Sequence, residues 1–128
     1  MPKFSANLGF LWTELPLLER IRAAADAGFR AVELHWPYDT APELVRDACS
    51  ANAVTLVGIN APRGDSKGDF GLGALEGRCG EFEASIEQAV AYARTAGASA
   101  IHVLAGVVAH RDSATWERPD HHLRAWPL

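Results

Sequence analysis

The sequence is poor in cysteine, in positive charge and in long apolar stretches. Cys49 and Cys79 are its only two cysteines, too few for a disulfide framework, and they favour reduced thiols in a cytoplasmic protein. A formal net charge of −4 gives no general electrostatic attraction to nucleic acid or to an anionic membrane. No apolar run approaches the roughly 18 residues that cross a bilayer, and the first residues lack the basic-then-apolar pattern of a signal peptide.

The remaining composition is that of one globular domain. Hydrophobic residues make up 48% of the chain and charged residues 22%, which fits neither a disordered nor a collagen-like chain. A length of 128 residues is enough for one domain with its own core and too short for two ordinary domains.

Short strand-like segments alternate along the sequence with segments of helical periodicity. The predicted strands are residues 4–8, 30–35, 54–60 and 100–104. The predicted helices are residues 14–27, about 40–52 and about 81–96. Since strands that alternate with helices are typical of parallel βα units, the sequence predicts an α/β fold with about four parallel strands and three helices.

The predicted helices carry start and stop signals at their ends. Thr13 is the expected N-cap of the first helix, and residues 40–43 have the form of a capping box for the second. Asn52 can close the second helix. Gly28 and Gly97 stand where a left-handed residue would stop the first and third helices.

A long segment rich in glycine and aspartate, residues 61–79, separates the third strand from the third helix. Loops of this length are uncommon inside a compact domain and are usually functional. Arg63 lies in this loop beside Gly64 and Asp65. These three residues could belong to a mobile lid with a substrate-facing arginine or to a solvated turn, and the sequence favours neither.

Alternation along each strand divides its side chains between the helices and the opposite face. In a βα barrel that opposite face is the interior, and the carboxyl ends of its strands can hold chemistry. The apolar residues assigned to the helices include Phe4, Ile59 and Val103, whereas Leu56 is assigned to the interior. The polar residues assigned to the interior are Asn7, Glu33, His35, Asn60 and His102.

This polar set has two interpretations. Unpaired polar groups in a dry interior are costly, so neighbours such as Glu33 and His35 could simply support each other. Alternatively, the set forms a pocket for a small oxygenated substrate, which is the interpretation we favour without making any member catalytic. Trp12, Trp36 and Tyr38 follow strand ends and could wall such a pocket or merely pack.

The last residues, 109–128, differ from the rest of the chain because they show no apolar period. They contain three of the five histidines, His110, His121 and His122, without the paired spacing of a zinc site. We therefore predict a partial barrel domain over residues 1–108 and an atypical tail over 109–128. The tail is either a genuine segment, which could be disordered, or the product of a frameshifted or truncated gene model, and we favour the latter.

Several short motifs, spaced over residues 3–108, resemble those of hydroxypyruvate isomerases. These motifs are Phe4–Leu8, Ala27–Glu33 with Trp36–Tyr38, Asn60–Pro62 with Gly64 and Asp65, Gly77 and Arg78 with Glu81 and Phe82, and Tyr92–Arg94 with Gly97. That group belongs to the wider xylose-isomerase-like TIM barrel superfamily, which includes sugar epimerases and an endonuclease branch.

The resemblance implies the N-terminal half of a (β/α)₈ TIM barrel. It also implies that hydroxypyruvate and tartronate semialdehyde interconvert through an enediol, with a divalent metal such as Mg²⁺ stabilising the enediolate oxygens. The catalytic glutamates and metal ligands of the family come from the second half of the barrel, so no catalytic or metal-binding residue is assigned here. The predicted substrate-binding residues are Asn7, Glu33, His35, Asn60, Arg63 and His102.

The leading hypothesis is a hydroxypyruvate isomerase that is truncated and inactive alone. Two other functions stay open. One is a 2-oxo-tetronate isomerase or a related sugar isomerase or epimerase. Another is a non-catalytic half-barrel that self-associates through open sheet edges or docks with a missing half. The expected partner is a small oxo-acid substrate, with neither nucleic acid nor a membrane.

Overall fold

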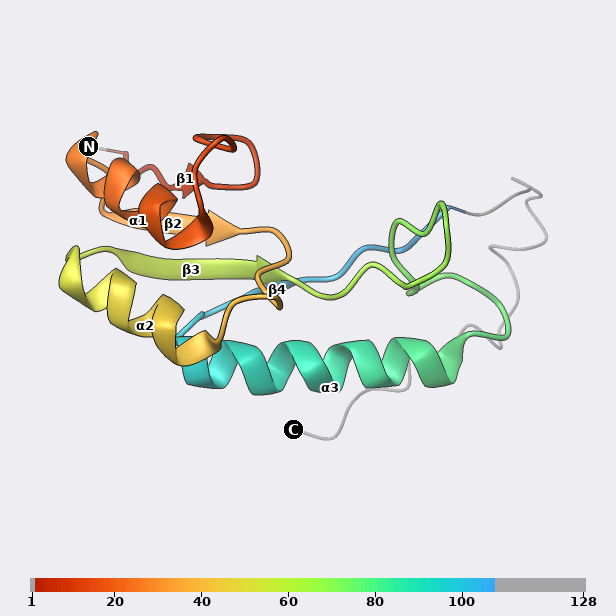
Figure 1. The fold of residues 1–128 in the computed structure, drawn as a ribbon. Helices are drawn as coiled ribbons and strands as arrows, with labels where there is room; N and C mark the ends of the chain where they lie inside the picture. The colour runs from red at the N-terminus through yellow and green to blue at the C-terminus, as the bar shows by residue number, and fades with distance from the viewer. Residues whose placement is uncertain (1, 108–128) are drawn as a thin grey trace.

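The computed structural model describes residues 2–107, so the predicted tail over 109–128 lies outside the described residues. Four strands form a parallel sheet in the order β1-β2-β3-β4, which confirms the predicted α/β architecture (Figure 1). The elements in chain order are β1 (Ala6–Asn7), α1 (Leu17–Asp26), β2 (Ala31–Leu34), α2 (Pro42–Ala51), β3 (Thr55–Asn60), α3 (Cys79–Ala96) and β4 (Ile101–His102). Within residues 2–107, no helix is long and apolar enough to cross a membrane.

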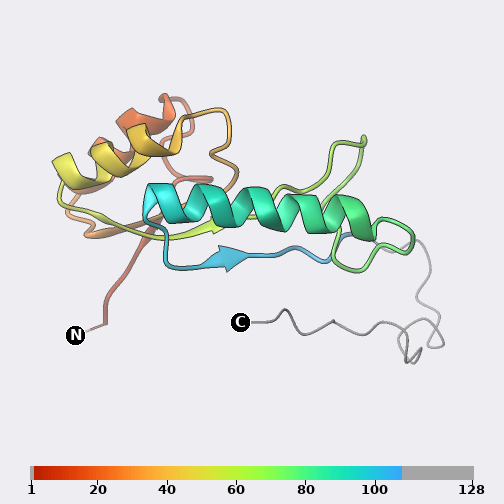
Figure 2. The same cartoon turned by 90° about the horizontal axis from the view of Figure 1, so that it is seen from below.

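The three helices cover one face of the sheet, and the hydrophobic core lies between the two layers (Figure 2). The largest fully buried side chains are Leu8, Ile21, Val32, Leu34, Val45 and Ile59, which come from the strands, their ends and the first two helices. Burying an aliphatic side chain of this size contributes roughly 1.5–3 kcal/mol. Packing of helices on a single face therefore fixes which side of each strand is apolar.

The third strand departs from simple alternation. Leu56 is only 3% exposed and pairs with Val32, so its assignment to the interior is wrong. The register shifts here, because Val32 pairs with Leu56 while Glu33 pairs with Gly58. Val57 is the extra residue of this bulge, and its carbonyl accepts a hydrogen bond from the Ser99 hydroxyl at 3.0 Å. The bulge places Leu56 and Ile59 together in the core.

The two edge strands are shorter than the sequence predicts. β1 and β4 have two residues each. Phe4 and Val103, which alternation assigns to the helices, are 71% and 43% exposed. Both lie beyond the paired residues of a strand with one neighbour, so neither reaches the core.

The expected N-caps of the first two helices are wrong. α1 begins after Pro16 and α2 after Ala41, and neither helix start has a side-chain capping hydrogen bond. The carbonyl of Thr13 instead accepts a hydrogen bond from Arg20, and this bond holds residues before α1 in a loop. The C-terminal signals are confirmed, since Asn52 donates to the Ala48 carbonyl at 2.8 Å and Gly97 is left-handed with φ 82°.

Tyr92 ties the loop between β2 and α2 to helix α3. Its hydroxyl lies 3.0 Å from the Pro37 carbonyl oxygen and 2.8 Å from that of Thr40. Burial, followed by the negative charge of Glu43, raises the pKa of Tyr92 to about 12. The hydroxyl is therefore protonated and able to donate throughout the neutral range.

We predict that Tyr92→Phe lowers the free energy of unfolding by about 1–2 kcal/mol, because two loop carbonyls lose their donor. Urea unfolding at pH 7 followed by circular dichroism measures this change. Since the folded pKa is raised, the Tyr92 contribution should be complete below the ordinary pKa of about 10 and decline as pH rises towards 12. Thr95→Ala, which removes an exposed hydroxyl on the same helix, should change stability by less than about 0.5 kcal/mol. Equal unfolding midpoints for Tyr92→Phe and the wild type would contradict this role.

Candidate functional site

The carboxyl ends of the four parallel strands meet at one edge of the sheet. Register pairs Asn7 with Glu33 across β1 and β2, and Asn60 with His102 across β3 and β4. The backbone N–H of Asn60 donates to the His35 carbonyl at 2.8 Å, which places His35 beside the end of β3. The structure thus brings all five inward polar residues of the sequence prediction to the same edge.

Four members of this set have hydrogen-bond partners at this edge, and one pair of them, Asn60 and His102, interacts directly. His102 Nδ1 lies 3.3 Å from Asn60 Oδ1, and Asn7 Oδ1 accepts a hydrogen bond from the Gly9 amide at 3.0 Å. The Ser5 hydroxyl donates to the Glu33 carboxylate. Ser5, rather than His35, is therefore the partner of Glu33, and the predicted support between Glu33 and His35 is wrong.

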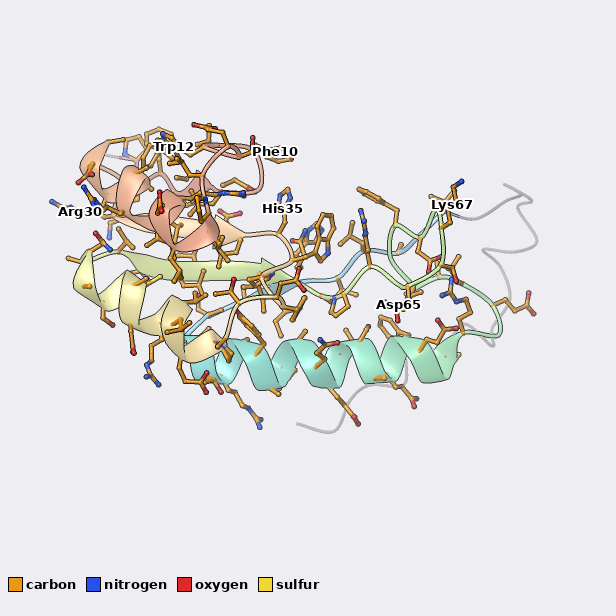
Figure 3. The ribbon with its side chains drawn as sticks, in the orientation of Figure 1. Phe10, Trp12, Arg30, His35, Asp65 and Lys67 are labelled. Atoms are coloured by element: carbon orange, nitrogen blue, oxygen red, sulfur yellow. The ribbon has the colours of Figure 1, made fainter. Side chains whose placement is uncertain are left out.

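His35 belongs to a row of aromatic rings along this edge. Its ring centroid lies 4.7 Å from that of Phe10 and 5.3 Å from that of Trp36, both in edge-to-face orientation. Figure 3 shows Phe10 and His35 close together at the carboxyl ends of the strands, with Arg30 at the opposite end of β2. Phe70 extends the row, with its centroid 6.2 Å from Trp36.

Gly9 makes room for the His35 ring. A Cβ atom on Gly9 would lie 2.1 Å from His35 Nδ1, far inside van der Waals contact. The imidazole therefore rests directly against the backbone after β1. This contact explains why a glycine follows the first strand, a requirement that the sequence alone did not show.

Trp36 fixes Arg63 at the same edge. The Trp36 indole N–H donates to the Ala61 carbonyl at 3.1 Å, which sets the plane of the ring. The guanidinium carbon of Arg63 lies 5.0 Å from the indole centroid, in cation–π contact. Arg63, predicted to face substrate from the long loop, thus lies beside the aromatic row.

The other two aromatic candidates have different roles. Tyr38 donates to the Asn60 carbonyl at 2.6 Å and packs edge-on against Tyr92. Trp12 packs against Phe29, with ring centroids 6.4 Å apart. Trp36 is therefore the member of the predicted wall that contacts both His35 and Arg63.

The long loop, whose observed extent is residues 61–78, is anchored by a charged pair that sequence reasoning missed. Arg78 donates to both carboxylate oxygens of Asp69, at 2.7 and 2.8 Å, and the Asp69 side chain is 9% exposed. These hydrogen bonds hold the pKa of the Asp69 carboxyl below its usual value.

Gly64 is needed where the loop passes Asp69. Its φ of 106° is left-handed, and a Cβ atom at this position would lie only 2.2 Å from Asp69 Oδ2. The loop also meets the residues after β4 through a bridge between Gly71 and Ala105.

A cleft of about 340 Å³ opens between the β1–α1 loop and the β2–α2 loop. Its lining includes Gly9, Arg20, His35, Trp36 and Asp39. Arg20 shapes it by donating to three carbonyls, of Leu8, Thr13 and Leu15, at 2.7–3.1 Å. The cleft has the size of a small-molecule site. His35 is the predicted substrate-binding residue that lines it.

The residues described do not fit a metal centre. Within residues 2–107, no group of three or more His, Cys, Asp and Glu side chains comes together in a way that could hold an ion. Two carboxylates near this edge are already engaged, Glu33 by the Ser5 hydroxyl and Asp69 by Arg78.

Comparison with known proteins matches this chain to one family. The family model described as "Xylose isomerase-like TIM barrel" matches residues 21–126. A mouse protein named "Putative hydroxypyruvate isomerase" is 48% identical over 108 residues, which are 83% of this chain and 39% of that protein. A 2-oxo-tetronate isomerase from Cupriavidus necator is 43% identical over 109 residues, 84% of this chain and 42% of that protein. The chain spans about two fifths of the length of these curated relatives.

A solved structure has the same arrangement of elements. The crystal structure of AP endonuclease, family 2 from Brucella melitensis superimposes with a TM-score of 0.83 and 35% sequence identity. The match covers 90% of this chain and 45% of that chain.

We predict that Gly9→Ala displaces the His35 ring from the aromatic row, because the new methyl group would occupy its place. The His35 imidazole resonances and their nuclear Overhauser contacts to Phe10 measure this displacement. Gly80→Ala is the matched control, since nothing lies within 4 Å of a Cβ at that helical position. Retention of the His35–Phe10 contact in Gly9→Ala would show that the position of the His35 ring does not require a glycine at residue 9.

Proposed function

Since the chain belongs to the xylose isomerase-like TIM barrel family, we propose that it supplies the first half of an isomerase that interconverts hydroxypyruvate and tartronate semialdehyde. The observation that carries this proposal is the 48% identity over 108 residues to a relative named for hydroxypyruvate isomerisation. The position of the polar residues supports it, because they lie at the carboxyl ends of parallel strands, where barrel enzymes bind substrates.

The reaction moves protons without net oxidation. C3 of hydroxypyruvate loses a proton, C2 gains one, and the hydroxyl hydrogen passes from O3 to O2 by way of an enediol. The described residues suit binding and orientation of such a substrate. Asn60 and His102 offer neighbouring polar atoms at the strand ends, and His35 lines the adjoining cleft. Glu33, whose carboxylate accepts from Ser5, is given no acid or base role.

A divalent cation such as Mg²⁺ is part of the proposal, with its ligands outside residues 2–107. Bound there, it would stabilise the negative charge that develops on the enediolate oxygens. Because residues 2–107 hold no group that could bind a metal ion, we propose that these residues bind and shape the substrate end of the pocket.

Open sheet edges lead us to infer that the 128-residue chain is inactive alone. In the described part of the chain, β1 pairs with β2 and β4 with β3, so each has one neighbour. A barrel closes when its last strand pairs with its first. Unpaired edges favour docking with a second half-barrel or self-association. We also propose a cytoplasmic location, which suits the free thiols of Cys49 and Cys79.

A second candidate is isomerisation of a 2-oxo-tetronate, favoured by the 43% identity to the Cupriavidus necator enzyme. Both candidate substrates are short 2-oxo carboxylates, so they need the same kind of pocket. A non-catalytic half-barrel is the alternative outside enzymes. Nucleic-acid chemistry, suggested by the name of the structural neighbour, is not proposed because a net charge of −4 gives no attraction to phosphates.

We predict that the 128-residue chain shows no hydroxypyruvate isomerase turnover, and that mixing it with the separately expressed second half of the mouse relative restores turnover. A coupled assay for tartronate semialdehyde measures the rate, and size-exclusion chromatography reports the assembly. A chelator should abolish the restored rate. Chelator-sensitive turnover by the chain alone would contradict inactivity. Assembly without turnover on either 2-oxo acid would favour the non-catalytic half-barrel.

A further inference from the structure

We propose that the guanidinium of Arg63 binds the substrate carboxylate through two N–H groups. Trp36 holds the guanidinium in position for this contact. This inference rests on the proposed function and narrows it to a substrate class, the short 2-oxo carboxylates. A pocket for a carboxylate needs a cation that is fixed in position and still free to donate hydrogen bonds.

Two of the arginines at this edge are already engaged. Arg20 donates through all three of its terminal groups to the loop carbonyls of the β1–α1 connection. Arg78 is committed to the carboxylates of Asp69 and Glu81. Neither can turn towards a ligand without releasing the loop that it holds.

Arg63 differs from both. In residues 2–107, no carboxylate lies within ion-pair distance of its guanidinium, and no backbone carbonyl accepts a hydrogen bond from it. Its contact is with the Trp36 ring face, 5.0 Å from guanidinium carbon to ring centroid. A guanidinium held over an aromatic face by this contact keeps its N–H donors available, in the planar fork that matches a carboxylate.

Arg63 lines a hollow formed by residues 63–70 of the long loop, and Trp36 is the residue that both contacts Arg63 and lines the cleft. Trp36 lines the cleft together with His35, and its indole is held by the Ala61 carbonyl. The backbone of Arg63 is held as well, since its carbonyl accepts from the Gly71 amide at 2.8 Å. Lys67, a further cation of the same loop (Figure 3), is exposed as Arg63 is, but within residues 2–107 the cation–π contact belongs to Arg63. The geometry therefore favours Arg63 over Lys67 as the carboxylate group.

A pair of probes that differ at one group tests this assignment. Hydroxypyruvate carries a carboxylate where dihydroxyacetone carries a neutral hydroxymethyl group, and both have the same hydroxyketone. Titrations of the 128-residue chain, followed by tryptophan fluorescence, give the affinity for each probe. The variants are Arg63→Met, Arg63→Lys and, as a loop control of the same charge change, Lys67→Met. Circular dichroism confirms that each variant is folded.

We expect Arg63→Met to weaken hydroxypyruvate binding by about tenfold to a hundredfold and to leave dihydroxyacetone binding unchanged. Arg63→Lys should lie between Arg63→Met and the wild type, because it keeps the charge and loses the fork. Lys67→Met should bind like the wild type. Equal weakening for both probes would overturn the proposal, and so would wild-type affinity for hydroxypyruvate in Arg63→Met. Wild-type protein that binds neither probe would instead count against the proposed function itself, and with it this inference.

Discussion

The parallel direction of all four strands is the constraint on which the rest of the structure depends. Because β1 to β4 are neighbours in chain order, every connection must return along one face, and the helices cover that face. All carboxyl ends then lie at one edge, so residues far apart in sequence, such as Asn7 and His102, become part of one surface. Within residues 2–107, the same arrangement leaves β1 and β4 with a single neighbour each.

Contacts from the helices and loops then shape that edge. Arg20 of α1 gathers the carbonyls of the first loop, Tyr92 of α3 holds the second, and Arg78 before α3 holds the third through Asp69. Each of these contacts joins a side chain in or next to a helix to one of the three loops. The aromatic row and Arg63 therefore lie on or beside loops that these contacts anchor, which suits a preformed binding surface.

Much of the fold could be predicted from local pattern, whereas the details of the site could not. Strand and helix order follow from hydrophobic periodicity, and Gly97 and Asn52 follow from the stereochemistry of helix ends. The bulge at Val57 was missed because it breaks the period of two and is stabilised by a distant residue, Ser99. The Ser5–Glu33 and Asp69–Arg78 pairs were missed for the same reason, since each depends on loop or strand placement in space.

The central claim is that the carboxyl edge of the sheet forms the substrate surface. Chemical-shift mapping by two-dimensional NMR of the 128-residue chain during titration with hydroxypyruvate tests it most directly. We expect shifts at His35, Asn60 and the Trp36 indole, and none at Arg30 or Thr55 near the amino ends of β2 and β3. Shifts confined to the amino ends, or spread evenly over both ends of the sheet, would contradict it.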